Sequence, residues 1–77
     1  MQGWTYSGGF RINKGIQGDK QMFFGSVVFN LEKRMWSYQV MSKHEGSYAI
    51  TVIAQGLEAT ARLCLESANA ILEEAAK

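Results

Sequence analysis

The sequence predicts an α+β fold, in which an antiparallel sheet of three to four strands is followed by one C-terminal amphipathic helix packed on one sheet face. Three observations lead to this order, β-β-β-β-α. Apolar residues recur every three or four positions in the last part of the chain, they alternate with polar residues before it, and short polar segments join the alternating runs. A length of 77 residues fits one domain, 1-77, with a single core.

The first predicted strand, at about 4-12, is the least regular. Gly8 and Gly9 interrupt it, and they would give it a bulge or a sharp bend. The next segment, 13-20, is rich in glycine and polar residues and is predicted to be a mobile loop.

Three more strands are predicted, at about 22-31, 35-42 and 48-55. Apolar and polar residues alternate along the last two of them. The polar connections at 30-34 and 43-47 are short, so neighbouring strands should be antiparallel hairpins.

The helix is predicted at about 57-76. Its apolar positions fall within an arc of about 120°, the width expected of a helix that packs on a sheet. They are Leu57, Ala61, Cys64, Leu65, Ala68, Ile71, Leu72 and Ala75. Together with the strand patterns, this stripe predicts a core made of Val27, Phe29, Trp36, Tyr38, Val40, Ile50, Val52, Ala61, Leu65, Ala68 and Leu72.

A core of this size supplies only roughly 3 to 5 kcal/mol, so we expect a second source of stability. A lone Cys64 makes no disulfide within the chain, and no cluster of Cys or His offers a metal site. Self-association is therefore expected, without metal or cofactor. One thiol, no secretion signal and no membrane-spanning run predict a soluble cytoplasmic protein.

The strand at 22-31 is apolar on both faces. One face is expected to carry Phe23, Val27, Phe29 and Leu31, and the other Met22, Phe24 and Val28. One helix covers one face only, so we expect a second copy of the chain to cover the other. The predicted dimer interface is Met22, Phe24, Val28, Met35 and Met41.

The charge distribution is uneven and bears on the choice of partner. Residues 1-56 carry six Lys or Arg against three acidic residues, whereas residues 57-77 carry two against four. Besides itself, the protein is expected to bind a macromolecule, and a protein is favoured over nucleic acid. The alternative is nucleic-acid binding by a basic aromatic sheet, with contacts from Arg11, Lys14, Lys20, Lys33, Arg34 and Lys43.

Reactive side chains are few, and the sequence predicts no enzyme. His44 falls in a polar hairpin loop and is expected to be solvated. Cys64 sits in the middle of the apolar stripe and is expected to be a buried small hydrophobe. Leu63, opposite that stripe, is a candidate partner contact.

Part of the chain resembles a DNA-binding family. The run Trp36-Ser37-Tyr38-Gln39-Val40, the hairpin after it and Gly56 before the helix resemble the arm-binding domain of tyrosine recombinases, a three-stranded sheet with a helix. The resemblance covers about half of the chain. In that family the strand before the glycine is basic and a threonine follows the glycine by three residues. Here the strand at 48-53 has no basic residue and Thr60 follows by four, so the DNA-contacting residues do not carry over.

In overall style the chain also resembles small phage or mobile-element proteins, anti-CRISPR inhibitors among them. This likeness is one of composition: a short aromatic-rich sheet combined with an acidic helix. It implies a partner protein in a host cell.

Overall fold

The computed structural model describes residues 3-8 and 11-77. Within them the chain forms an antiparallel sheet and one C-terminal helix, which confirms the predicted α+β class with one strand more than the three to four expected. The strands are β1 (Thr5–Ser7), β2 (Arg11–Gln17), β3 (Gln21–Asn30), β4 (Met35–His44) and β5 (Thr51–Glu58), and the helix is α1 (Ala61–Ala75).

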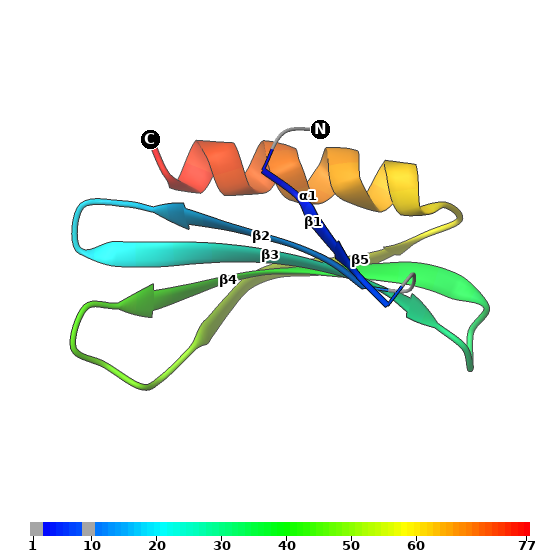
Figure 1. The fold of residues 1–77 in the computed structure, drawn as a ribbon, viewed down its shortest axis with the longest axis horizontal. Coiled ribbons are helices and arrows are strands. Elements are labelled where there is room, and N and C mark those ends of the chain that lie inside the picture. The colour runs from blue at the N-terminus through cyan, green and yellow to red at the C-terminus, as the bar shows by residue number, and fades with distance from the viewer. Residues whose placement is uncertain (1–2, 9–10) are drawn as a thin grey trace.

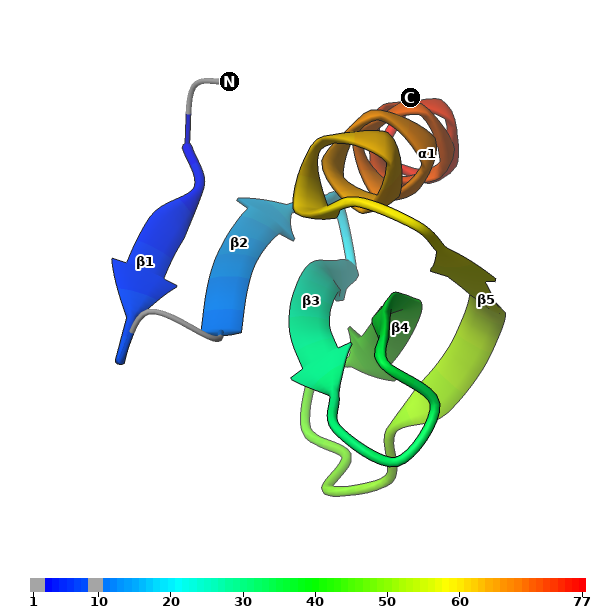
Figure 2. The same cartoon turned by 90° about the vertical axis from the view of Figure 1, so that its right-hand side faces the viewer.

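The strands lie in the sheet in the same order as in the sequence, β1-β2-β3-β4-β5, so that β1 and β5 are its edges. Figure 1 shows α1 running along one face of this sheet. The sheet bends toward the helix, and its two edges flank it in the end-on view of Figure 2. No helix in the described part of the chain is both long and apolar enough to cross a membrane.

The N-terminal region corrects the prediction. Instead of one strand at 4-12 and a loop at 13-20, the structure has two strands, β1 and β2. Residues 13-17 form most of β2 and pair with β3, from Asn13 opposite Ser26 to Gln17 opposite Met22. Pairing with a long neighbouring strand outweighs the low strand propensity of these polar and glycine residues. Gly9 lies outside the described residues, so the predicted bend is not placed.

The boundary between β5 and α1 also lies later than predicted. The strand was expected at 48-55 and the helix from 57, but Leu57 and Glu58 belong to β5 and the helix begins at Ala61. Thr60 caps it, since its hydroxyl accepts a hydrogen bond from the Leu63 amide at 3.2 Å. The first turn of the predicted apolar stripe is therefore strand.

The core lies between α1 and the middle of the sheet. Of the predicted core residues, Val27, Val40, Leu65, Ala68 and Leu72 are buried, and Trp36, Tyr38 and Ala61 pack partly buried against them. Phe29 is half-buried and meets Trp36 edge to face, with ring centroids 5.3 Å apart.

Two predicted core residues are not in the core. Ile50 precedes β5 and is 58% exposed, and Val52 is 48% exposed. Their prediction was wrong because Met41 pairs with Val52 while Val40 pairs with Ala54, a β-bulge that leaves Ile53 unopposed and breaks the alternation. Trp4, Ile12 and Phe23, which were not in the predicted core, and Cys64, which was expected to be buried, complete the buried apolar residues of the described chain.

Two glycines make room for aromatic rings within the sheet. A Cβ atom on Gly25 would lie 2.7 Å from Cη2 of Trp4 and 3.5 Å from Cδ2 of Leu72. A Cβ atom on Gly56 would lie 2.7 Å from the Tyr38 hydroxyl oxygen. Each ring thus occupies the space that a Cβ atom would take at a glycine of a nearby strand, which allows close packing at that point.

We expect Gly25→Ala to lower the free energy of unfolding by about 1 to 3 kcal/mol, because the added methyl group overlaps the Trp4 ring in a packed core. Chemical denaturation monitored by circular dichroism measures this change. Gly15→Ala is the matched control in the adjacent strand, because the nearest atom to its Cβ would be the flexible end of Met22, at 3.4 Å, and its other neighbours would lie at an ordinary contact distance of 3.9 Å. Equal stabilities of the two variants would contradict the packing of Trp4 on Gly25.

Candidate functional site

The face of the sheet opposite α1 is the largest surface that no described element covers. We call it the open face: it carries residues 22, 24, 26, 28 and 30 of β3 and the residues paired with them in the neighbouring strands. All five residues of the predicted interface lie on it. Met22, Phe24 and Val28 come from β3, and Met35 and Met41 come from β4.

The register arranges the open face in rows that cross the strands. One row, the apolar row, consists of Gly15, Phe24, Met41 and Val52. The next, the polar row, consists of Thr5, Asn13, Ser26, Gln39 and Gln55 and crosses all five strands. No residue of either row carries a charge.

The polar row divides the predicted interface into two parts. Met22 lies on the same side of it as the apolar row, whereas Val28 and Met35 lie on the other side. Within the row, the amide nitrogen of Gln39 donates to the amide oxygen of Gln55 at 3.2 Å. Sequence reasoning missed this row, because it exists only once the pairing of all the strands is known.

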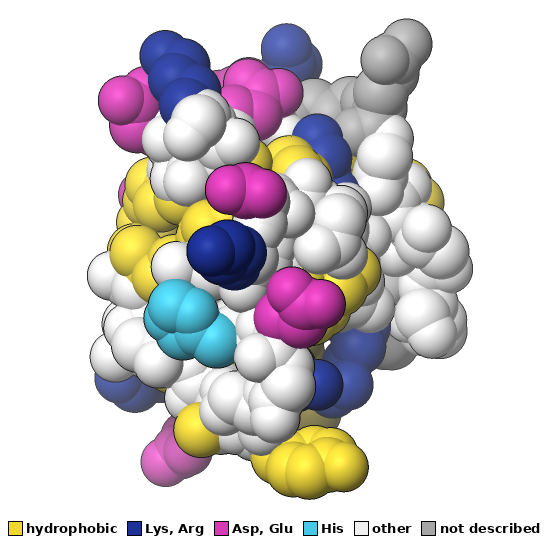
Figure 3. Space-filling model, turned by 90° about the vertical axis from the view of Figure 1, so that its left-hand side faces the viewer, with side chains coloured by type: hydrophobic (Ala, Val, Ile, Leu, Met, Phe, Trp, Pro, Cys, Tyr) yellow, Lys and Arg dark blue, Asp and Glu magenta, His cyan; other side chains and the backbone are white. Residues whose placement is uncertain are grey.

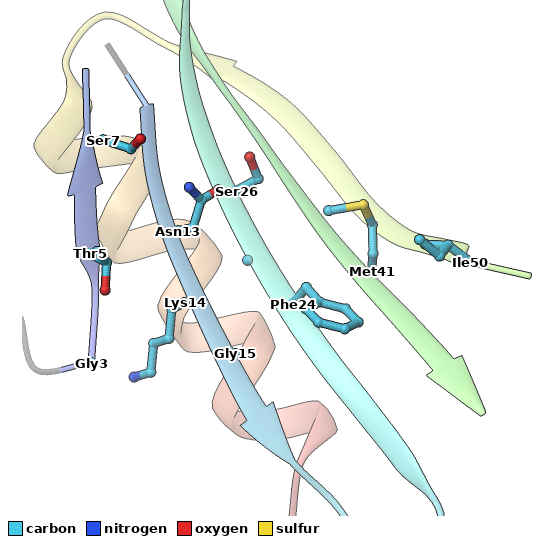
Figure 4. Close-up of a pocket in the computed structure, with 11 residues that line it drawn as sticks. Gly3, Thr5, Ser7, Asn13, Lys14, Gly15, Phe24, Ser26, Met41 and Ile50 are labelled. Atoms are coloured by element: carbon cyan, nitrogen blue, oxygen red, sulfur yellow. The ribbon is translucent and has the colours of Figure 1, made fainter. Parts of the chain in front are cut away.

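A shallow groove runs over β1, β2 and β3 on the open face (Figure 4). The hydroxyl groups of Thr5, Ser7 and Ser26 and the amide of Asn13 line it on one side. Phe24, Met41 and Ile50 line it on the other. Lys14 also lines the groove, which therefore offers hydroxyl and amide groups and one cation next to an aromatic ring and apolar side chains.

The six predicted nucleic-acid contacts do not form one patch. Lys33 and Arg34 lie in the turn between β3 and β4, and the register places Arg11 near that end of the sheet, opposite Val28. Lys20, in the turn between β2 and β3, and Lys43, opposite Met22, lie at the other end. The ammonium group of Lys43 lies 5.7 Å from the centre of the Tyr48 ring.

Lys14, the sixth of these cations, belongs to a contact that joins the sheet to the helix. Its ammonium group donates to the side-chain oxygen of Asn69 at 2.9 Å, and the indole nitrogen of Trp4 donates to the same oxygen at 3.1 Å. All three residues are half-buried or buried. Asn69 thus fixes the N-terminal residues on the flank of α1, and Lys14 has a structural partner.

The remaining candidate side chains lie apart. His44 is exposed at the end of β4, where Figure 3 shows it beside side chains of both charge signs. Cys64 is fully buried in α1. Burial raises the pKa of its thiol, and this outweighs a backbone hydrogen bond with Glu58 that lowers the pKa; the charge of Glu58 raises it further. Leu63 is 43% exposed on α1, outside the buried stripe.

No protein-family model matches the chain, and neither a curated protein nor a solved structure matches it.

The Asn69 contact generates a test. Asn69→Leu should lower the free energy of unfolding by about 1 to 3 kcal/mol, because it leaves the Trp4 indole and the Lys14 ammonium without their acceptor. Asn69→Asp keeps an acceptor at the same place and adds a charge that attracts Lys14, so its stability should match or exceed that of the parent. Thermal unfolding compares the three proteins, and equal losses in both variants would show that the side-chain oxygen is unimportant.

Proposed function

We propose that this protein is a non-catalytic interaction module, which forms a homodimer through its open face and binds a macromolecular partner with the rest of its surface. The observation that carries the proposal is the pair of uncharged rows in the middle of the open face. An uncharged, partly aromatic area is typical of the centre of an interface between subunits.

The chemistry of the two rows suits a second copy of the same chain. Phe24 and Met41 supply apolar contact area, and methionine adapts its shape to a partner surface. The amides of Asn13, Gln39 and Gln55 each have donor and acceptor atoms, so a polar row can form hydrogen bonds with its own copy. In such a dimer the apolar surface is buried and the amide groups are hydrogen-bonded.

The size of the open face also supports a dimer. The molecule extends over 36 × 23 × 21 Å, and the view down its shortest axis shows the sheet edge-on with α1 above it, so the open face extends over at most 36 by 21 Å (Figure 1). A face of this size is comparable with the surface of about 800 Å² that each partner buries in an interface of standard size.

For the further partner, protein remains favoured over nucleic acid. The candidate cations are divided between two ends of the sheet, and Lys14 is engaged with Asn69. Phosphate backbones are instead bound by contiguous cationic surfaces. We also propose that the protein works in a reducing, intracellular compartment, since its single cysteine is a buried, free thiol. Its composition favours a phage or mobile-element protein that acts on a host protein.

Light scattering over a hundredfold range of concentration tests the dimer. The parent protein should give twice the mass of its 8.6 kDa chain over the upper part of this range. Phe24→Glu should give the monomer mass, because it places a carboxylate in the middle of the apolar row, where burial without a partner is costly. Val52→Glu, at an exposed position of the same row, should have the same effect with less risk to the fold.

Leu63→Glu is the matched control. It makes the same change from an apolar side chain to glutamate at a similar exposure, 43% against 48% for Val52, but on α1 and away from the open face. This variant should remain dimeric. A mass of 8.6 kDa for the parent at every concentration would refute the dimer, and dissociation of all three variants would assign the effect to net charge.

A further inference from the structure

After the open face, the edge formed by β5 is the second candidate surface for a binding partner. Among the described residues β5 pairs only with β4, so the peptide groups along its outer side have no neighbouring strand. The other edge, β1, has only three residues, whereas β5 has eight. From Thr51 to Leu57 it contains no charge and no proline, two of the devices that protect an edge from pairing. The bulge at Ile53 is a third, and it leaves residues 54-57 as the regular part of the edge. Figure 2 shows this edge at the side of the molecule.

An apolar groove lies beside this edge, between β5 and the C-terminal half of α1. It is lined by Ile53, Ala70, Ile71, Glu74 and Ala75. Ile53 is the extra residue of the β-bulge, and it lines this groove although the regular alternation would not have placed it there. At 44% exposure it is an apolar side chain available for contact.

One carboxylate, that of Glu74, lines the groove. The side chain of Glu74 is 75% exposed, and its carboxylate forms an ion pair with the ammonium group of Lys77, also exposed, at 3.1 Å. Such an exposed pair is weak, so Glu74 remains available to a cation from outside. Residues 61-75 of α1 contain three glutamates and one arginine, which makes this side of the edge acidic.

We propose that the β5 edge and its groove bind an extended segment of a partner protein by adding it as a sixth strand. The unpaired peptide groups of β5 select an extended backbone. The groove takes an apolar side chain of that segment against Ile53 and Ile71. Glu74 takes a lysine or arginine two positions away from it, on the same side of the added strand.

A second copy of this chain fits the same edge less well. A two-fold axis that joined two β5 strands would place both α1 helices side by side on one face of the continuous sheet. Both helices carry net negative charge, and β5 itself offers no cation to Glu74. Charge complementarity therefore favours a foreign segment that is apolar and basic.

The experiment selects ligands for the full chain from a display library of random 12-residue peptides. The selected peptides should share an apolar residue and a lysine or arginine two positions apart. Ile53→Lys should weaken their binding about tenfold or more, since it fills the groove with a like charge. N-methylation of alternate peptide nitrogens along the paired edge of a selected peptide should abolish binding, because it removes the backbone donors without changing the protein.

Charge reversal supplies the matched control. Glu74→Lys should weaken the selected peptides about threefold to tenfold and restore the affinity of peptides in which the cation is replaced by glutamate. Glu73→Lys changes net charge equally, but Glu73 does not line the groove, and it should have a smaller effect. Amide chemical shifts of the labelled protein should change along β5 and the C-terminal half of α1.

The proposal is overturned if no peptide is enriched, if the N-methylated peptide binds as well as its parent, or if Glu73→Lys and Glu74→Lys act alike. It is also overturned if β5 proves to pair with a second copy, which would appear as self-association abolished by Ile53→Lys. Phe24 and Ile53 lie on different surfaces, so peptide binding measured on the Phe24→Glu variant separates this proposal from the dimer of the open face.

Discussion

The structure depends on one constraint: a single helix has to cover a sheet wider than itself. A helix is about 10 Å wide, whereas five strands spaced about 4.8 Å apart cover about 19 Å. Accordingly α1 sits over the middle of the sheet, where Val27, Val40, Cys64 and Leu72 have no exposed surface. The helix does not cover the sheet at its two flanks, nor the opposite face of the sheet. The candidate binding surfaces lie in these uncovered parts.

The two flanks of the helix differ in how the sheet and the helix meet there. On the β1 side, Trp4 lies over Gly25 and donates to Asn69, so an aromatic side chain bridges the sheet and the helix. A pocket lined by Ile12 and Leu65 lies on the same side, next to the N-terminal half of α1. On the β5 side, Ile53 borders a groove next to the C-terminal half of α1, and this groove lies along the longer of the two sheet edges.

The elements that were predicted correctly are those whose conformation depends on residues close together in the sequence. The helix after Thr60, the two long strands β3 and β4, and the faces to which Phe23, Phe24 and Val27 point follow from periodicity and are confirmed. The strand β2 could not be predicted in this way, because its residues are polar and its conformation is imposed by pairing with β3.

Similar reasons explain the other differences. Leu57 continues the helical spacing of the residues after it, although the cap at Thr60 excludes it from the helix. The β-bulge at Ile53 leaves no sign in the alternation of its strand, so Val52 was assigned to the wrong face. For the candidate site, the sequence predicted which apolar residues share the open face, but the polar row needs the register of four strand pairs and could not be read from any one strand.

The order of the strands has a consequence for how the chain folds. Each strand pairs with its neighbour in the sequence, so the sheet is built from contacts that close short loops and form early at low entropic cost. The hydrogen bond between Trp4 and Asn69 spans 65 residues and needs the sheet and the helix in place before it. We therefore expect the contact between Trp4 and Asn69 to form last in folding and to open first under mild denaturation. In native-state hydrogen exchange, β1 would then behave as a separate unit that detaches while β3, β4 and α1 stay folded.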